Sequence, residues 1–189
     1  VMRIVLMICC ILMLALPAKA LEIAGVTIPE TIAGDDGTTL VLNGAGVRSK
    51  FVFDVYIAQL YLEKAAAETK DVITPDGHKR MVMHFLYDKV EKASLVEAWS
   101  DGFSNNTPAD RLTALQQRID QFNAMFTDAK KGDVIVLDYT PNQGTKVTIA
   151  GTEKGVIPGK DFNDAMLLIW LGDKPVTKDL RAKLLAAGK

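Results

Sequence analysis

The sequence predicts an α+β domain in which helices pack on one face of a large antiparallel sheet. Segments with strand patterns come first and two helical segments follow, and the chain then returns to strands and ends in two further helices. This order lacks the alternation of strand and helix that builds parallel sheets, so an antiparallel sheet is expected. Residues 52–63 carry the strongest strand pattern and are almost uncharged. A strand that is apolar on both faces is covered on both faces, which places it inside the domain.

Strand patterns dominate residues 21–87. Gly44 and Gly46 interrupt the second strand, and isolated glycines in a strand indicate a bulge or the close approach of another group. Pro75-Asp76-Gly77 marks a turn, because proline pre-sets φ and glycine tolerates positive φ. The expected strands cover residues 21–28, 38–47, 52–63 and 80–87, and a short helical turn covers residues 65–69.

From residue 88 the apolar residues recur mainly at helical spacing. Thr107 and Pro108 suit the start of a helix, as a capping hydroxyl followed by proline at the first helical position. Lys131-Gly132-Asp133 ends that helix and turns the chain into further strands. The expected helices cover residues 88–103, 107–130, 160–172 and 175–187, and the expected strands cover residues 134–139, 145–150 and 155–157.

Residues 1–20 have the parts of a secretory signal peptide: a basic residue, a short apolar run and an A-x-A cleavage site. The apolar run is short for a membrane span, although a retained anchor is the alternative. We expect cleavage after Ala20, a single domain over residues 21–189, and a periplasmic or secreted location. Both cysteines of the chain lie in this leader, so the expected mature chain has no disulfide and no thiol chemistry.

Charge and motifs exclude several classes of function. The chain holds 22 basic and 23 acidic residues, for a formal net charge of −1, and no basic block supports nucleic-acid binding. Beyond the leader no apolar stretch reaches spanning length. Common nucleotide-binding and hydrolase motifs are absent, and His78 and His84 lack ligand-type neighbours, so neither a metal nor a cofactor is expected. This favours binding without chemistry.

Arg48 is the leading candidate for a functional residue. It ends a glycine-containing bend, Asn43-Gly-Ala-Gly-Val-Arg48, at the mouth of the long apolar strand. A cation at the edge of an apolar layer costs free energy unless it pairs with an opposite charge. Asp54 is one candidate partner, which would make Arg48 structural. The anionic or carbonyl head of a ligand is the other, because a guanidinium offers a fixed fork of donors.

Other polar residues are weaker candidates. Tyr87 ends a strand before a helix, where side chains face clefts, but the local sequence fits a core tyrosine with its hydroxyl in water better. Tyr56 is expected to pack in the core. His78 follows a turn and is expected to be exposed, and His84 is expected to be structural.

Four segments in order along the chain resemble motifs of the chalcone isomerase-like family, most closely its bacterial exported branch. The resemblance covers nearly all of the chain after the leader. It implies an open-faced antiparallel β-sandwich, with helices packed on one face of a large sheet and a cleft between the layers. The segments are residues 43–63, 139–145, 155–162 and 169–172.

The resemblance also implies site residues. In plant chalcone isomerases an arginine on this bend polarises a flavonoid substrate, and it corresponds to Arg48. A family tyrosine falls on Tyr87, an asparagine falls on Ser94, and a threonine falls on Tyr56. A late serine or threonine lands near Phe162 or Asn163. Relatives within the fold bind fatty acids without catalysis, with the equivalent arginine and a tyrosine on the carboxylate.

Three functions follow as hypotheses. The first is an exported binding protein for a fatty acid or similar amphipathic carboxylate, held by Arg48, Tyr56, Tyr87, Ser94 and Asn163. The second is a periplasmic interaction or scaffold protein, with its partner undefined. The third is an isomerase, an intramolecular lyase acting on a chalcone-like enone, with Arg48 and Tyr87 as catalytic residues. Candidates to contact the ligand tail are Phe53, Val55, Met81, Met83, Phe85, Met166 and Trp170.

Overall fold

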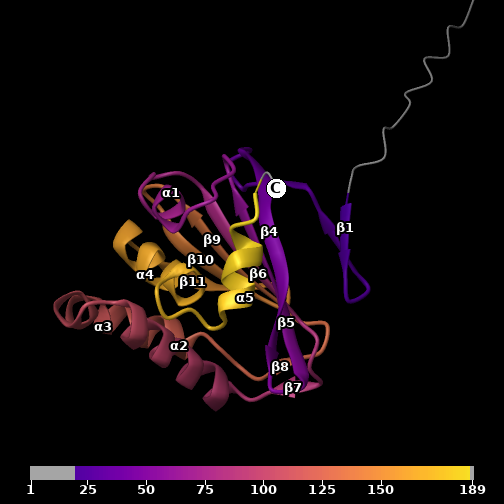
Figure 1. The fold of residues 1–189 in the computed structure, drawn as a ribbon. Coiled ribbons are helices and arrows are strands. Elements are labelled where there is room, and N and C mark those ends of the chain that lie inside the picture. The colour runs from indigo at the N-terminus through magenta and orange to yellow at the C-terminus, as the bar shows by residue number, and fades with distance from the viewer. Residues whose placement is uncertain (1–19, 188–189) are drawn as a thin grey trace, which may run out of the picture.

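A curled seven-stranded antiparallel sheet with helices on one side forms the body of the protein (Figure 1). The computed structural model describes residues 20–187. This architecture confirms the predicted α+β class. The seven strands are β3 (Thr31–Ala33), β4 (Thr39–Lys50), β5 (Phe53–Leu62), β6 (Lys79–Phe85), β9 (Val134–Thr140), β10 (Gly144–Ile149) and β11 (Thr152–Ile157).

The strands lie in the order β11-β10-β9-β6-β5-β4-β3, so β5 and β6 are central. The helices between β6 and β9 join two neighbouring strands and pack on one face. Figure 1 shows all the labelled helices on that side of the sheet. They are α1 (Thr69–Ile73), α2 (Lys92–Asn106), α3 (Ala109–Ala124), α4 (Lys160–Leu171) and α5 (Lys178–Leu184).

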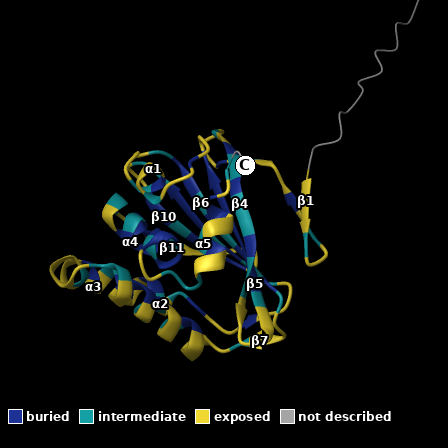
Figure 2. Cartoon of the chain, viewed as in Figure 1, coloured by how far each residue is buried: buried dark blue, intermediate teal, exposed yellow. Residues whose placement is uncertain are grey.

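The main core lies between the sheet and the helices, and aromatic rings fill its centre. Trp99 of α2 meets the Trp170 ring of α4 edge-on, with the ring centroids 5.6 Å apart. Phe122 of α3 packs edge-on against Trp99 at 5.3 Å. Aromatic pairs in this geometry add stability beyond their buried area. Figure 2 shows the result: the helices are buried where they face the sheet and exposed on their outer sides.

A smaller core covers the other face of the sheet. The hairpin of β1 (Ala20–Ile23) and β2 (Val26–Pro29) lies on the side away from the helices (Figure 1). Ile28 of this hairpin clusters with Ile57 and Tyr61 of β5, whereas Tyr56 and Leu60 of β5 face the main core. β5 is therefore covered on both faces, as its apolar sequence predicts.

Several predicted boundaries are wrong in the N-terminal half. The strand expected over 21–28 is a hairpin, because Ala24 and Gly25 adopt positive φ (49° and 77°) and reverse the chain. The helical turn expected at 65–69 begins only at Thr69, as α1. The sequence also gave no sign of β3, which pairs with the start of β4.

The predicted helix starts are also displaced. The helix expected from residue 88 begins at Lys92, because β7 (Lys89–Val90) pairs with β8 (Ala129–Lys130). Thr107 caps no helix start, since it closes the C-terminal end of α2 and Pro108 holds the N-cap position of α3. The last helix, expected from residue 175, begins at Lys178. Thr177 is its N-cap, because the Thr177 hydroxyl accepts a hydrogen bond from the Leu180 amide.

The predicted signal peptide lies outside the described residues, apart from Ala20 in β1. Cys9 and Cys10 lie outside them as well. Among residues 20–187, no helix combines the length and apolar character needed to cross a membrane.

Candidate functional site

The glycine-containing segment of β4 positions α5. The buried Asn43 side chain donates from Nδ2 to the carbonyls of Ala66 and Leu184, at 2.9 and 2.7 Å. A Cβ atom on Gly44 would collide with the backbone carbonyl of Lys183, so only glycine allows α5 to lie this close to the strand. The segment is therefore part of one continuous strand that docks a helix, and Arg48 follows at its end.

Arg48 lies on the helix side of the sheet, opposite Tyr56 in the pairing of β4 with β5. Its Cζ atom is 5.6 Å from the centre of the Tyr56 ring, within the range of a cation–π contact. No carboxylate among residues 20–187 lies within ion-pair distance of Arg48. Asp54, the predicted partner, instead accepts a hydrogen bond from the Ser49 hydroxyl at 2.6 Å.

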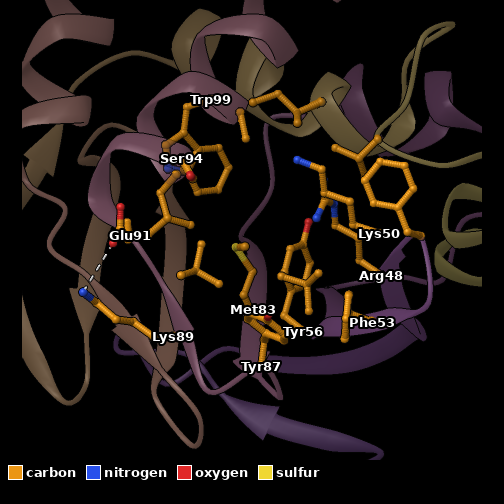
Figure 3. Close-up of a pocket in the computed structure, with 17 residues that line it drawn as sticks. Arg48, Lys50, Phe53, Tyr56, Met83, Tyr87, Lys89, Glu91, Ser94 and Trp99 are labelled. Carbon is orange, nitrogen blue, oxygen red and sulfur yellow. Dashed lines mark ion pairs between the residues drawn. The ribbon is translucent and has the colours of Figure 1, made fainter.

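A cavity of about 460 Å³ lies beside Arg48, between the end of the sheet and α2 (Figure 3). Its size falls within the usual range for small-molecule sites. Its apolar wall combines Phe53, Val55 and Met83 from the sheet with Leu95, Ala98 and Trp99 from α2.

The Tyr56 hydroxyl is a buried polar group of the cavity wall. Tyr56 is 5 % exposed, and its hydroxyl accepts a hydrogen bond from Trp170 Nε1 at 2.9 Å. Burial raises the pKa of Tyr56 above its ordinary value, and the positive charge of Arg48 and the Trp170 bond only partly offset this. The hydroxyl therefore keeps its proton at neutral pH, and no described residue accepts it. A ligand oxygen is a suitable acceptor.

The rim of the cavity is polar. Tyr87 is 39 % exposed and meets the Phe53 ring edge-on, with the centroids 5.5 Å apart. Ser94 lines the cavity from α2. Lys89 and Glu91 form an ion pair at 3.6 Å across the rim (Figure 3).

Four of the five candidate ligand-binding residues therefore line one cavity: Arg48, Tyr56, Tyr87 and Ser94. Asn163 does not, because it lies buried in α4, where its Nδ2 donates to the Thr145 hydroxyl at 3.3 Å. Three of the seven candidate tail contacts, Phe53, Val55 and Met83, belong to the lining. The other four are buried in the main core and are absent from the lining: Met81, Phe85, Met166 and Trp170.

His78 was predicted to be exposed, and this prediction is wrong, because His78 is only 1 % exposed. Its Nε2 lies 2.9 Å from Asp138 Oδ1, and its Nδ1 lies 3.3 Å from Asp36 Oδ1. Arg80 binds the same Asp138 carboxylate through two nitrogens, at 2.7 and 2.6 Å. Within residues 20–187, no group of three or more histidine, cysteine, aspartate or glutamate residues is arranged to hold a metal ion.

Comparison with known proteins identifies the family. The sequence model of the family described as "Chalcone isomerase-like" matches residues 20–186. The chain belongs to the chalcone isomerase-like family. The resemblance of the four segments is thereby confirmed over nearly the whole described chain. A search of curated proteins finds no match.

A solved structure supports the fold of this chalcone isomerase-like chain. It is similar to the crystal structure of a fatty-acid binding protein from Arabidopsis thaliana, with a TM-score of 0.68 and 18% sequence identity. The match covers 88% of this chain and 96% of the other. At this identity the likeness establishes the shared fold.

Lys50 and Trp99 are among the residues of this cavity that sequence reasoning missed. Lys50 lines it two positions beyond Arg48, where the sequence shows only a strand end. Trp99 also lines it, and its buried Nε1 donor has no partner among the described residues. The helical pattern placed Trp99 on the apolar side of its helix. The sequence held no signal for the orphaned donor, because that depends on which side chains other elements bring near.

Proposed function

We propose that this chalcone isomerase-like protein binds a fatty acid or a similar amphipathic carboxylate, with Arg48 holding the head group. One observation carries the proposal: Arg48 has no carboxylate partner in the described chain and lines an apolar cavity. A guanidinium at such a place is stabilised by an anion with two oxygens, which it can bind through a pair of hydrogen bonds.

Two buried donors of the cavity wall lack an acceptor among the described residues. The Tyr56 hydroxyl keeps its proton and has no acceptor among the described residues. The Trp99 indole N–H is buried without a partner. A buried donor without an acceptor costs about 1–3 kcal/mol, so a ligand oxygen that accepts from either group recovers part of that free energy.

The tail has an apolar path along the two layers. The sheet contributes Phe53, Val55 and Met83, and α2 contributes Leu95 and Trp99. Methionine adapts its shape easily, which suits a site that accepts chains of different length. The fatty-acid binding protein of similar fold supports this ligand class by analogy.

The alternatives have less support. A scaffold role predicts a filled core with Arg48 paired to Asp54, whereas Asp54 is held by Ser49. An isomerase role is favoured by Arg48 and Tyr87 lining one cavity. The resemblance to plant chalcone isomerases, however, implies a threonine and an asparagine where this chain has Tyr56 and Ser94. Chalcone turnover above the uncatalysed rate would restore the isomerase hypothesis.

We also propose that the protein is exported and acts in the periplasm or outside the cell. The support is the signal-peptide pattern of residues 1–20. Fractionation followed by N-terminal sequencing tests this, and absence of the protein from the extracytoplasmic fraction would contradict it.

The binding proposal is tested by native mass spectrometry of the gently purified protein, followed by solvent extraction of bound molecules. The wild type is expected to carry an amphipathic carboxylate that Arg48→Ala has lost. Arg111→Ala is the matched control, because Arg111 is exposed on α3 and does not line this cavity. Equal lipid content in Arg48→Ala and the wild type would contradict the assigned role of Arg48.

A further inference from the structure

The turn between β4 and β5 carries an exposed apolar tip, residues Phe51 and Val52. Phe51 is 91 % exposed and Val52 is 86 % exposed. Two neighbours extend this surface, since Phe53 is 53 % and Tyr87 is 39 % exposed. Single exposed apolar residues are common on proteins, but a cluster of four around one turn marks an interaction surface.

The backbone of the tip adds to this argument. Phe51 has a φ of 56°, in the left-handed region that favours glycine. For a bulky residue this conformation costs about 1–2 kcal/mol. At 91 % exposure, the Phe51 side chain gains little from packing within the chain. Neither packing nor turn geometry therefore accounts for phenylalanine at this position.

The tip lies at the mouth of the Arg48 cavity. Phe51, Phe53 and Tyr87 belong to the cavity lining, although much of their surface faces solvent. The segment around Tyr87 is tied to β5, because the Leu86 amide donates to the Val55 carbonyl at 2.9 Å. A partner seated on the tip would therefore face the opening of the cavity.

Basic residues without an ion pair lie in the segments near the tip. Lys50 adjoins Phe51, Lys130 belongs to β8 and Lys131 follows it. Figure 1 shows β7 and β8 beside the end of β5. None of these three lysines forms an ion pair with a described residue. Acids lie in the same segments: Glu91 and Asp128 are engaged by Lys89, at 3.6 and 3.0 Å. Asp54 accepts from the Ser49 hydroxyl at 2.6 Å, Asp133 accepts from the Lys130 amide at 2.8 Å, and Asp88 follows Tyr87.

We propose that the Phe51–Val52 tip docks on the surface of a lipid bilayer that contains anionic lipids, with Lys50, Lys130 and Lys131 facing the head groups. Apolar side chains that enter the interface, flanked by lysines, provide both parts of peripheral membrane binding. Docking in this orientation turns the cavity mouth toward the bilayer. If the proposed ligand class is right, an amphiphile can pass between bilayer and cavity without crossing water.

Vesicle co-sedimentation tests the docking. The purified protein, with the same N-terminus in every variant, is mixed with vesicles of phosphatidylcholine alone or with phosphatidylglycerol added. The wild type is expected to bind the mixed vesicles more strongly. Val52→Asp is expected to lower that binding at least about tenfold, because it removes an apolar side chain that would enter the bilayer and adds a charge that anionic lipids repel.

The controls separate docking from folding. Val156→Asp makes the same change at a residue 39 % exposed on β11, and it is expected to bind like the wild type. Phe51→Gly relieves the positive φ, so it stays folded and still loses vesicle binding. The proposal is overturned if the wild type binds neither vesicle, or if Val52→Asp and Val156→Asp bind equally. The exposed tip would then be a candidate surface for a protein partner.

A second readout separates docking from ligand binding. Val52 does not line the cavity, so Val52→Asp is expected to bind laurate in solution as the wild type does. Failure of the wild type to bind laurate would defeat the ligand proposal, and a laurate affinity unchanged by Arg48→Ala would defeat the head-group role of Arg48, while vesicle binding still stands in either case. The reverse pattern would defeat the docking alone.

Discussion

Two arginines of the same sheet have opposite surroundings. Arg80 on β6 binds both oxygens of the Asp138 carboxylate, and the buried His78 ring contacts the same aspartate. Arg48 on β4 has the Tyr56 ring beside it and no carboxylate from the described chain. Within residues 20–187 the protein supplies an anion for Arg80 and none for Arg48. The first arginine therefore stabilises the fold, and we propose that a ligand supplies the anion for the second.

This difference decides which residue is a candidate for function. Both arginines lie on strands of the same sheet. Local sequence does not show which arginine has an internal partner, because the partner of Arg80 lies 58 positions away along the chain. The pairing of β6 with β9 brings Arg80 opposite Asp138, so the ion pair can be recognised only in the folded structure.

The largest expected loss of stability follows from the substitution Asp138→Asn. Asp138→Asn removes the two-point ion pair of Arg80, which keeps only the 3.6 Å contact with Asp35. It also leaves the buried His78 ring with Asp36 as its one remaining carboxylate among residues 20–187, and Asp138 is only 2 % exposed. Loss of one member of a buried charge pair costs about 3–5 kcal/mol, so the free energy of unfolding should fall by that amount. Urea denaturation measures it. Arg48→Ala should change the stability of the ligand-free protein by less than about 1 kcal/mol. Equal losses in the two variants would contradict the comparison.

Tyr56→Phe should have a smaller effect. It removes the hydroxyl that accepts from Trp170 Nε1 and leaves that buried donor unpaired. The free energy of unfolding should fall by about 1–3 kcal/mol at neutral pH. Tyr87→Phe, at a residue 39 % exposed, is the control and should stay close to the wild type.

The same variant has a pH signature. Burial raises the pKa of Tyr56, so above pH of about 10 the unfolded chain releases this proton while the native state retains it. The contribution of Tyr56 to stability is then constant below that pH and falls as the pH rises further. The difference in unfolding free energy between the wild type and Tyr56→Phe should shrink above pH of about 10. A difference that grows there would show that Tyr56 ionises more easily in the folded state.

Local patterns predicted much of the fold and part of the cavity. The apolar strand at 52–63 and the helical spacing after residue 88 fixed the α+β class. Arg48, Tyr56, Tyr87 and Ser94 line one cavity, although their role in ligand binding stays a prediction.

The errors share a physical origin in contacts between distant residues. His78 was expected to be exposed because it follows a turn, yet its partners lie 42 and 60 positions away. Asn163 was assigned to the site by motif position, yet it hydrogen-bonds to Thr145 in the core. Trp99 was missed because an unpaired indole N–H leaves no pattern in a sequence.

The most direct test of the central claim is a calorimetric cycle that changes the arginine and the ligand head group together. Laurate and dodecanol have the same tail, and each is titrated into the wild type and into Arg48→Ala. If Arg48 holds the carboxylate, the substitution should weaken laurate binding by about tenfold or more and leave dodecanol binding nearly unchanged. Equal losses for the two ligands, or no loss for either, would contradict the claim that Arg48 lacks an internal anion because a ligand supplies it.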